Sequence, residues 1–281
     1  RTTSDPRTGE LAENTILTEF YLVREFTDGE LRLLIDGLLF SRHLPHSQCR
    51  ELVEKLEELS SVYFRSRVGH IAPMPEDRTD NRQLFLNIEL LDEAICRNRK
   101  VSFHYLEYRT DKQQHLRTRS DGSVREYVVT PYQMAAREGK YYLICNHDSH
   151  DNVANYRLDR ICDLEVLNES ARPFSSLTGT DGRPLDLAEY MRRHVYMYAS
   201  GDCRARLRIA SFLVSDMIDL FGMDIAFSDE DDNGVTATVF ANEMSVEQFA
   251  KSFAPHVTVL EPEDLRDRVK GMLERALEGY Q

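Results

Sequence analysis

Two arginines on one short stretch give this sequence its clearest potential for chemistry. Arg157 and Arg160 lie in the segment YRLDRI, which follows an aromatic segment containing Tyr141 and Tyr142. A guanidinium group presents a rigid fork of donors that matches a phosphate or a carboxylate. A tyrosine ring offers a flat face on which a nucleic-acid base can stack. These residue types together indicate a binding site for a phosphate-bearing ligand.

A structural role for Arg157 is the alternative. If YRLDRI is a strand, alternation places Arg157 and Asp159 on one face and Tyr156 and Leu158 on the other. Arg157 would then pair with Asp159 or with a neighbouring acid and stabilise the fold. The residues alone leave both interpretations open.

Two acidic or histidine-containing stretches have metal-ligand residue types, but neither meets the requirements of a metal site. Residues 146–152, NHDSHDN, form a predicted hairpin loop in which polar residues are expected, and nothing nearby completes a coordination shell. Residues 229–234, DEDDNG, begin like a calcium-binding loop, but the twelfth position, which requires glutamate, is Phe240. We therefore expect no metal and no other cofactor.

Known catalytic motifs are missing from the sequence as well. It contains no Ser-His-Asp motif, no P-loop and no G-x-G-x-x-G. We therefore expect a binding protein rather than an enzyme.

The composition limits the kinds of partner. The 281 residues carry a net charge of −13, and residues 201–281 alone hold eight Lys or Arg against sixteen Asp or Glu. Such a chain is a poor non-specific binder of duplex DNA, because neutralising phosphates dominates that affinity. No apolar run is long enough to span a membrane, and the five cysteines are scattered without a C-x-x-C motif. These features predict a cytoplasmic protein without a membrane partner.

The elements that must position the arginines change character near residue 101. Residues 1–14 read as a polar tail, and helices are predicted over 27–42, 46–64 and 84–100. Thr27 and Glu30 have the spacing of a capping box at the first helix, and Ser47 is the expected cap of the second. Their apolar residues recur at helical spacing.

From residue 101 the pattern becomes one of short strands. Alternating segments over 101–108, 124–137, 140–146 and 153–167 are separated by turn sequences, which suggests a small barrel. A connector follows at 175–200. Residues 201–281 then read as β-α-β-β-α-β-α, the order of a small α+β sandwich.

Four segments in this order, VSFHY, TPYQM, GKYYL and YRLDRI, resemble the WYL domain. The Trp-Tyr-Leu triplet that names this family reads Tyr141-Tyr142-Leu143 here, because the chain has no tryptophan. The resemblance covers residues 84–174 closely and extends over most of the chain. It implies an α+β protein with a tail and helical linker region at 1–83, an Sm-like β-barrel at 84–174, a connector at 175–200 and a C-terminal α/β sandwich extension at 201–281.

The same resemblance implies a function. WYL proteins are mostly transcriptional regulators that sense single-stranded nucleic acid or a nucleotide, bind DNA through an N-terminal helix-turn-helix, and form homodimers. No helix-turn-helix is recognisable before residue 14, and residue 1 is Arg rather than Met, so we expect further sequence upstream. The alternative is an accessory module, for example of a defence system, that docks on a partner protein without binding DNA.

The resemblance also assigns a ligand site. It implies that Arg157 and Arg160 contact the anion and that Tyr141 stacks on the base. Further residues are expected near the same mouth of the barrel, namely Tyr105, His104, Tyr132 and Arg137.

Overall fold

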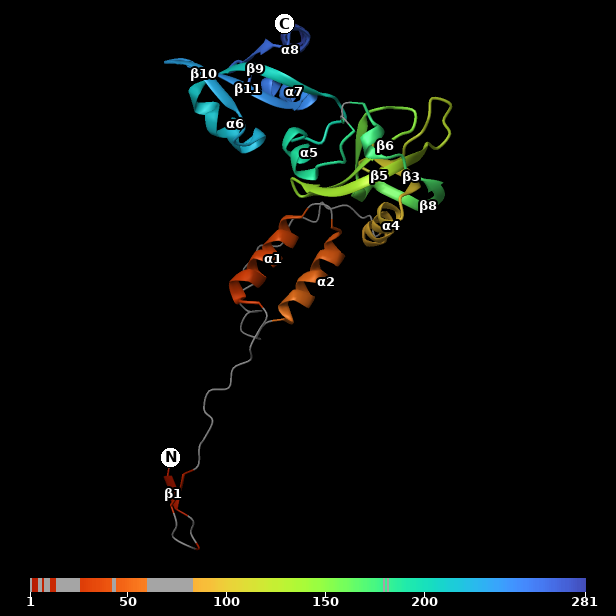
Figure 1. Ribbon diagram of the computed structural model, residues 1–281, viewed down its shortest axis with the longest axis vertical. Coiled ribbons are helices and arrows are strands. Elements are labelled where there is room, and N and C mark those ends of the chain that lie inside the picture. The colour runs from red at the N-terminus through yellow and green to blue at the C-terminus, as the bar shows by residue number, and fades with distance from the viewer. Residues whose placement is uncertain are drawn as a thin grey trace. The chain divides into compact units, whose positions relative to one another are not determined.

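The computed structural model describes residues 2–4, 7, 11–13, 26–41, 44–59, 83–178, 180 and 182–281. The chain divides into two compact units, one made of residues 1–40 and 47–76 and the other of residues 41–46 and 77–281. Figure 1 shows the order of their elements along the chain. Within the described residues, no helix is long and apolar enough to cross a membrane.

The first unit contains a short strand pair and two helices. Strands β1 (Thr2–Ser4) and β2 (Leu11–Glu13) pair antiparallel, where the sequence predicted only a tail. Helix α1 spans Asp28–Phe40 and helix α2 spans His46–Glu57. Buried Leu31 and Ile35 of α1 pack with apolar residues that include Val53 and Leu56 of α2. The end of the predicted second helix, residues 60–64, lies outside the described residues.

The predicted capping box at α1 is confirmed. The backbone N–H of Thr27 donates to the Glu30 carboxylate at 2.7 Å, and the Glu30 N–H donates to Thr27 Oγ1 at 3.3 Å. Two N–H groups that the helix leaves without internal partners are thereby satisfied. The prediction of Ser47 as a cap is wrong, because α2 already begins at His46 and Ser47 lies in its first turn.

Helix α4 (Leu84–Cys96) introduces a six-stranded antiparallel sheet. The strands are β3 (Arg99–Tyr108), β4 (Gln114–Leu116), β5 (Glu126–Arg137), β6 (Lys140–Asn146), β7 (Val153–Arg157) and β8 (Ile161–Ser170). Their order is β4-β3-β5-β6-β7, with β8 also on β3. Because β7 and β8 do not pair within the described residues, the sheet does not form the closed barrel that the strand pattern suggested.

One predicted strand is interrupted at the arginines. Residues 153–167 were expected to be a single strand, but Leu158–Arg160 form a 3₁₀ turn between β7 and β8. Leu158 and Ile161 are both fully buried. A strand would place residues three apart on opposite faces, whereas a 3₁₀ turn places them on one side. The burial of both side chains therefore favours the turn.

The connector contains structure that the sequence analysis did not predict. It holds a 3₁₀ turn at Phe174–Ser176 and helix α5 (Leu187–Arg193). Asp186 caps α5, because its carboxylate accepts a hydrogen bond from the Glu189 N–H at 3.0 Å.

The C-terminal region confirms the predicted order of elements. It comprises β9 (Asp202–Ile209), a 3₁₀ turn at Ser211–Leu213, α6 (Val214–Phe221), β10 (Ala226–Asp231), β11 (Gly234–Asn242), α7 (Glu243–Ser252), β12 (Val257–Glu261) and α8 (Glu263–Glu278). The antiparallel sheet has the order β10-β11-β9-β12. All three helices share one hydrophobic core with alternate residues of the central strands.

Candidate functional site

Arg157, the residue assigned most firmly to ligand binding, makes an ion pair. Its Nε donates to Asp159 Oδ1 at 3.0 Å and its Nη2 donates to Oδ2 at 2.5 Å. The Asp159 side chain is only 2% exposed, whereas that of Arg157 is 22% exposed. This is the structural pairing that the sequence allowed as an alternative. Arg157 ends β7 and Asp159 lies in the 3₁₀ turn, so the pair helps to fix the connection between β7 and β8.

Electrostatics support a structural part for this pair. Burial acts to lower the pKa of Arg157, but the hydrogen bonds and charge of Asp159 outweigh it and hold the pKa above its usual value. The Arg157 backbone N–H also donates to the Tyr105 hydroxyl at 3.1 Å. Burial raises the pKa of Tyr105, so its hydroxyl stays protonated near neutral pH.

Tyr105 belongs to an aromatic cluster rather than to an open stacking surface. Its side chain is 6% exposed, and its ring lies 5.1 Å from that of Tyr156 and 6.1 Å from that of Tyr127. Phe103 completes the cluster, with its ring stacked on Tyr127 at 5.5 Å. Edge-to-face and offset contacts of this kind stabilise a core beyond the area they bury.

Two guanidinium groups lie over tyrosine rings of this cluster, and a third lies over Tyr108. Arg117 lies 5.3 Å from the ring centre of Tyr105, and Arg125 lies 4.7 Å from that of Tyr127. Arg160 lies 5.8 Å from the ring centre of Tyr108, which is half exposed at the end of β3. These distances are within the range of cation–π interactions.

The charges of these three arginines are balanced to different extents. Arg117 pairs with Glu107 at 3.0 Å. Neither Arg125 nor Arg160 makes an ion pair with any residue that the structure describes, and the buried Nε of Arg160 has no hydrogen-bond partner among them. Buried donors of native proteins are almost always paired, so an unpaired one requires an explanation. A bound anion would supply the missing acceptor.

The remaining predicted site residues lie elsewhere on the sheet. On β6 it is Tyr142, not Tyr141, that pairs directly with Arg157 of β7, and directly paired residues share a face. Tyr141 therefore lies on the opposite face of β6 from Arg157, the face that also carries Leu143 and its partner Tyr156. Burial and, less strongly, the Asp92 charge raise the pKa of Tyr141. His104 is adjacent to Tyr105 on β3 and so points to the opposite face of the strand, with its Nδ1 3.2 Å from Asp163.

Two predicted residues face the connector. The Tyr132 ring meets Phe174 edge to face at 5.2 Å, and burial raises the pKa of Tyr132 to about 12. The Nε of Arg137 donates to the Val195 carbonyl at 3.1 Å. Of the seven predicted residues, the structure thus gathers Tyr105, Arg157 and Arg160.

Sequence reasoning missed Arg117, Arg125 and Tyr108. One signal was available for Arg125, which lies two residues before Tyr127 and therefore on the same face of a continuing strand. Arg117 is placed by pairing across the sheet, since its N–H donates to the Tyr105 carbonyl at 2.9 Å. No local sequence pattern predicts that strand pairing.

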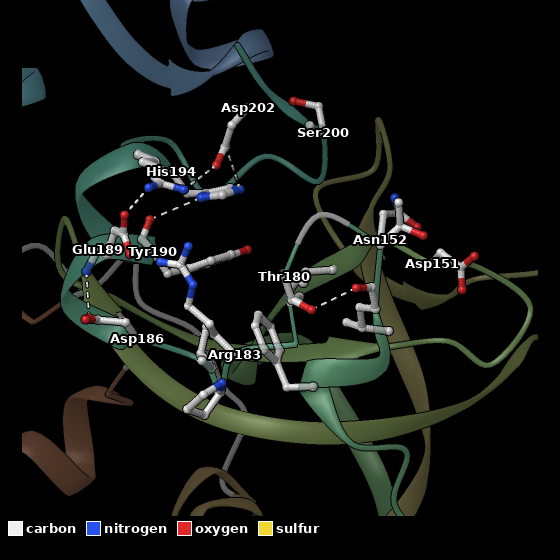
Figure 2. A pocket seen from close by; sticks show the side chains of 18 of the residues that line it. Asp151, Asn152, Thr180, Arg183, Asp186, Glu189, Tyr190, His194, Ser200 and Asp202 are labelled. Carbon is white, nitrogen blue, oxygen red and sulfur yellow. Dashed lines mark hydrogen bonds and ion pairs between the residues drawn. The ribbon is translucent and has the colours of Figure 1, made fainter. Parts of the chain in front are cut away.

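A separate cleft of about 1180 Å³ opens beside the connector (Figure 2). It is bounded by the β6–β7 loop, the connector and the start of the C-terminal sheet, and none of the seven predicted residues lines it. His194 stacks on Tyr190 with ring centres 3.9 Å apart, and its Nε2 lies 3.7 Å from Asp202 (Figure 2). Arg193 pairs with Asp202 at 3.2 Å and lies 4.5 Å from the Phe240 ring centre. The charged side chains on this side of the cleft pair mainly with one another.

No metal site is indicated for the part of the chain that the structure describes, because no group of three His, Cys, Asp or Glu side chains could hold an ion there. The stretch that imitated a calcium loop forms the β10–β11 turn. In that turn Asp231 Oδ1 accepts hydrogen bonds from the N–H groups of Asn233 and Gly234 at 2.8 and 3.0 Å.

His147 leads to a prediction about pH. Its Nε2 lies 2.8 Å from the Tyr156 hydroxyl, and burial lowers its pKa below the usual value of 6.5. Between those two pKa values the unfolded chain binds more protons than the folded chain. We expect this contribution to stability to be complete above pH 6.5 and to be lost as the pH falls further. Urea unfolding at pH 7.5 and 5.5 should show a smaller loss for His147→Gln than for the wild type.

A matched control is His46→Gln, which alters an exposed histidine at the start of α2. This variant should keep the full wild-type loss of stability between the two pH values. An equal pH dependence of His147→Gln and His46→Gln would contradict the assignment.

Comparison with known families identifies the two halves of the second unit. Residues 87–166 match the WYL domain model. The chain contains a WYL domain. Residues 201–277 match the WCX domain model, so the C-terminal sheet is the WCX domain. The WYL domain is the sheet that carries Arg117, Arg125 and Arg160 over their tyrosine rings, a group called the arginine–tyrosine cluster from here on.

Two solved structures are similar to this chain at low sequence identity. One is described as proteasome accessory factor B/C (PafBC) of Arthrobacter aurescens, with 18% identity and a TM-score of 0.33, and the match covers 91% of this chain but only 37% of that one. Another is described as a CRISPR Cas-related protein, with 14% identity, a TM-score of 0.44 and coverage of 89% of this chain and 72% of that one. A search of curated proteins finds no significant match.

Proposed function

We propose that this chain is the sensing part of a WYL-type transcriptional regulator, and that its WYL domain binds a phosphate-bearing effector. The effector is a single-stranded nucleic acid or a nucleotide. The presence of WYL and WCX domains supports a regulatory role. The observation that carries the proposal is the group of arginines around the tyrosines, in which Arg125 and Arg160 make no ion pair with any described residue.

The chemistry of the group suits a nucleotide better than a simple anion. Arg160 and Arg125 provide positive charge for the phosphate. The half-exposed ring of Tyr108 provides a stacking surface, a part that the sequence had assigned to Tyr141. Arg157 contributes indirectly in this proposal, because its pair with Asp159 fixes the 3₁₀ turn that carries Arg160.

Regulation would follow from a difference in effector affinity between two arrangements of the protein. DNA binding would require a helix-turn-helix upstream of this sequence, and we take a homodimer as the functional unit. The Sm-like form of the WYL sheet and the lack of enzymatic activity belong to the same proposal.

The test is fluorescence-anisotropy titration of the chain with a labelled thymidine dinucleotide across a salt series. We expect Arg125→Gln/Arg160→Gln to weaken binding on the order of tenfold and to flatten the salt dependence, because the two guanidinium groups proposed to neutralise the phosphate are lost. Arg97→Gln/Arg99→Gln is the matched control, since it removes the same charge between α4 and β3. It should bind like the wild type.

Equal weakening by both double variants would contradict the assigned site. Absence of saturable binding by the wild type would contradict the sensing proposal itself. That second outcome would favour a module that docks on a partner protein.

A further inference from the structure

One face of the WCX sheet carries a row of arginines. On β9 the residues Ala205, Leu207 and Ile209 are at most 1% exposed and belong to the core that the helices cover. Because side chains alternate along a strand, the residues between them lie on the opposite face of the sheet. These residues are Arg204, Arg206 and Arg208.

The register extends this face across the neighbouring strands. Arg204 pairs directly with Phe240 of β11, and Arg206 pairs with Thr238. The Phe240 side chain is 49% exposed. Arg206 also pairs with Glu261 of β12. Directly paired residues share a face, so Phe240, Thr238 and Glu261 lie on the same face of the sheet as the arginines.

The row is positively charged, whereas its domain as a whole is acidic. Residues 201–281 contain only eight basic residues against sixteen acidic ones, yet three of the eight share this strand face. Alternate residues of a strand are about 6.6 Å apart. That repeat is comparable to the spacing of successive phosphates along an extended single strand of nucleic acid.

The carboxylates that pair with these arginines do not prevent another anion from binding to them. Arg206 is 2.8 Å from Glu261 and Arg208 is 2.5 Å from Asp231, but both carboxylate side chains are more than half exposed. Exposed ion pairs of this kind contribute little and exchange readily for another anion. Arg204 is exposed and has no ion-pair partner among the described residues.

We infer that this face of the WCX sheet binds a single strand of nucleic acid, with Arg204 and Arg206 against its phosphates and Phe240 against a base. A cationic track next to an exposed aromatic ring is the usual means of holding a single strand without sequence preference. The site is separate from the arginine–tyrosine cluster of the WYL domain. It therefore does not depend on the effector proposed for that cluster.

The experiment is anisotropy titration of the whole chain with a labelled twelve-nucleotide oligothymidine across a salt series. It is done in the wild type and in the Arg125→Gln/Arg160→Gln background, where binding reports on the WCX face. In both, Arg204→Ala/Arg206→Ala should weaken binding on the order of tenfold and reduce the magnitude of the salt slope by about 1.4, the value for two phosphate contacts on a single strand. Phe240→Ala should weaken binding without changing that slope.

Two further variants make the test specific. Glu261→Gln should strengthen binding several-fold, because it removes the carboxylate that competes for Arg206. Arg266→Ala/Arg275→Ala removes the same charge from α8 and should leave binding unchanged.

Three results would overturn the inference. The first is an equal effect of the two arginine-to-alanine pairs. The second is competition by polyglutamate as effective as that by unlabelled oligothymidine, which would mark a general polyanion or acidic-protein surface. The third is loss of all oligonucleotide binding in the Arg125→Gln/Arg160→Gln background, which would leave the WYL site as the sole contact.

Discussion

Replacing Arg157 with Ala is expected to lower the free energy of unfolding by about 3–5 kcal/mol. The variant removes both guanidinium hydrogen bonds from Asp159, whose side chain is 2% exposed. Removing two charge-assisted hydrogen bonds from a buried carboxylate is far more costly than removing them from an exposed one. Urea unfolding of the variant and the wild type measures the difference.

The control for this prediction is Arg97→Ala, which breaks an exposed pair with Glu93 one helical turn away. Such a pair contributes about 0.3–0.5 kcal/mol, so the control should unfold close to the wild-type midpoint. A loss below about 1 kcal/mol for Arg157→Ala would show that Asp159 is well accommodated without the arginine, and Arg157 would again be a candidate for direct ligand contact.

Local patterns in the sequence predicted most of the secondary structure. The capping box at Thr27 and Glu30 and the β-α-β-β-α-β-α order after residue 201 are confirmed, because both depend on neighbouring residues and their periodicity. Helix α5 was missed because it has only seven residues and lies in a segment rich in turn-forming residues. Such a short helix depends on its cap and on tertiary contacts more than on its own periodicity.

The candidate site was harder to predict, because it depends on register. Tyr141 was chosen over Tyr142 from its place in the family triplet, but only strand pairing reveals that Tyr142 lies opposite Arg157. The 3₁₀ turn at Leu158–Arg160 also changes which side chains meet. Neither the turn nor the pairing of Arg117 with the Tyr105 strand is encoded in a short window of sequence.

The residues that sequence reasoning chose are nevertheless chemically related to those that the structure gathers. Arginines and tyrosines were expected in this domain, and the structure places Arg117, Arg125 and Arg160 over tyrosine rings. Composition within a domain can therefore indicate the types of side chain at a candidate site before the individual contacts are known. Selecting the contacting residues requires the pairing of the strands.

A second large effect is expected at Gly234, the first residue of β11. Its φ is +159°, and a Cβ added there would lie 2.2 Å from the carbonyl oxygen of Ile209. That atom belongs to the backbone of the paired strand β9, so it cannot move aside as a flexible side chain would. We expect Gly234→Ala to lower the free energy of unfolding by about 3 kcal/mol or more, since the strained backbone and the steric clash add together.

Gly271→Ala in α8 provides the matched control in the same domain. A Cβ at that position meets only the end of the Arg275 side chain, at 3.5 Å, which is ordinary contact. Because Ala is favoured over Gly inside a helix by up to about 1 kcal/mol, this variant should be as stable as the wild type or more so. Urea midpoints of the two variants, measured in parallel, distinguish the clash at Gly234 from the general effect of replacing glycine with alanine. If Gly234→Ala unfolds at the wild-type midpoint, β9 and β11 do not approach as closely as described, and the strand register that aligns Arg204 with Phe240 would be wrong with it.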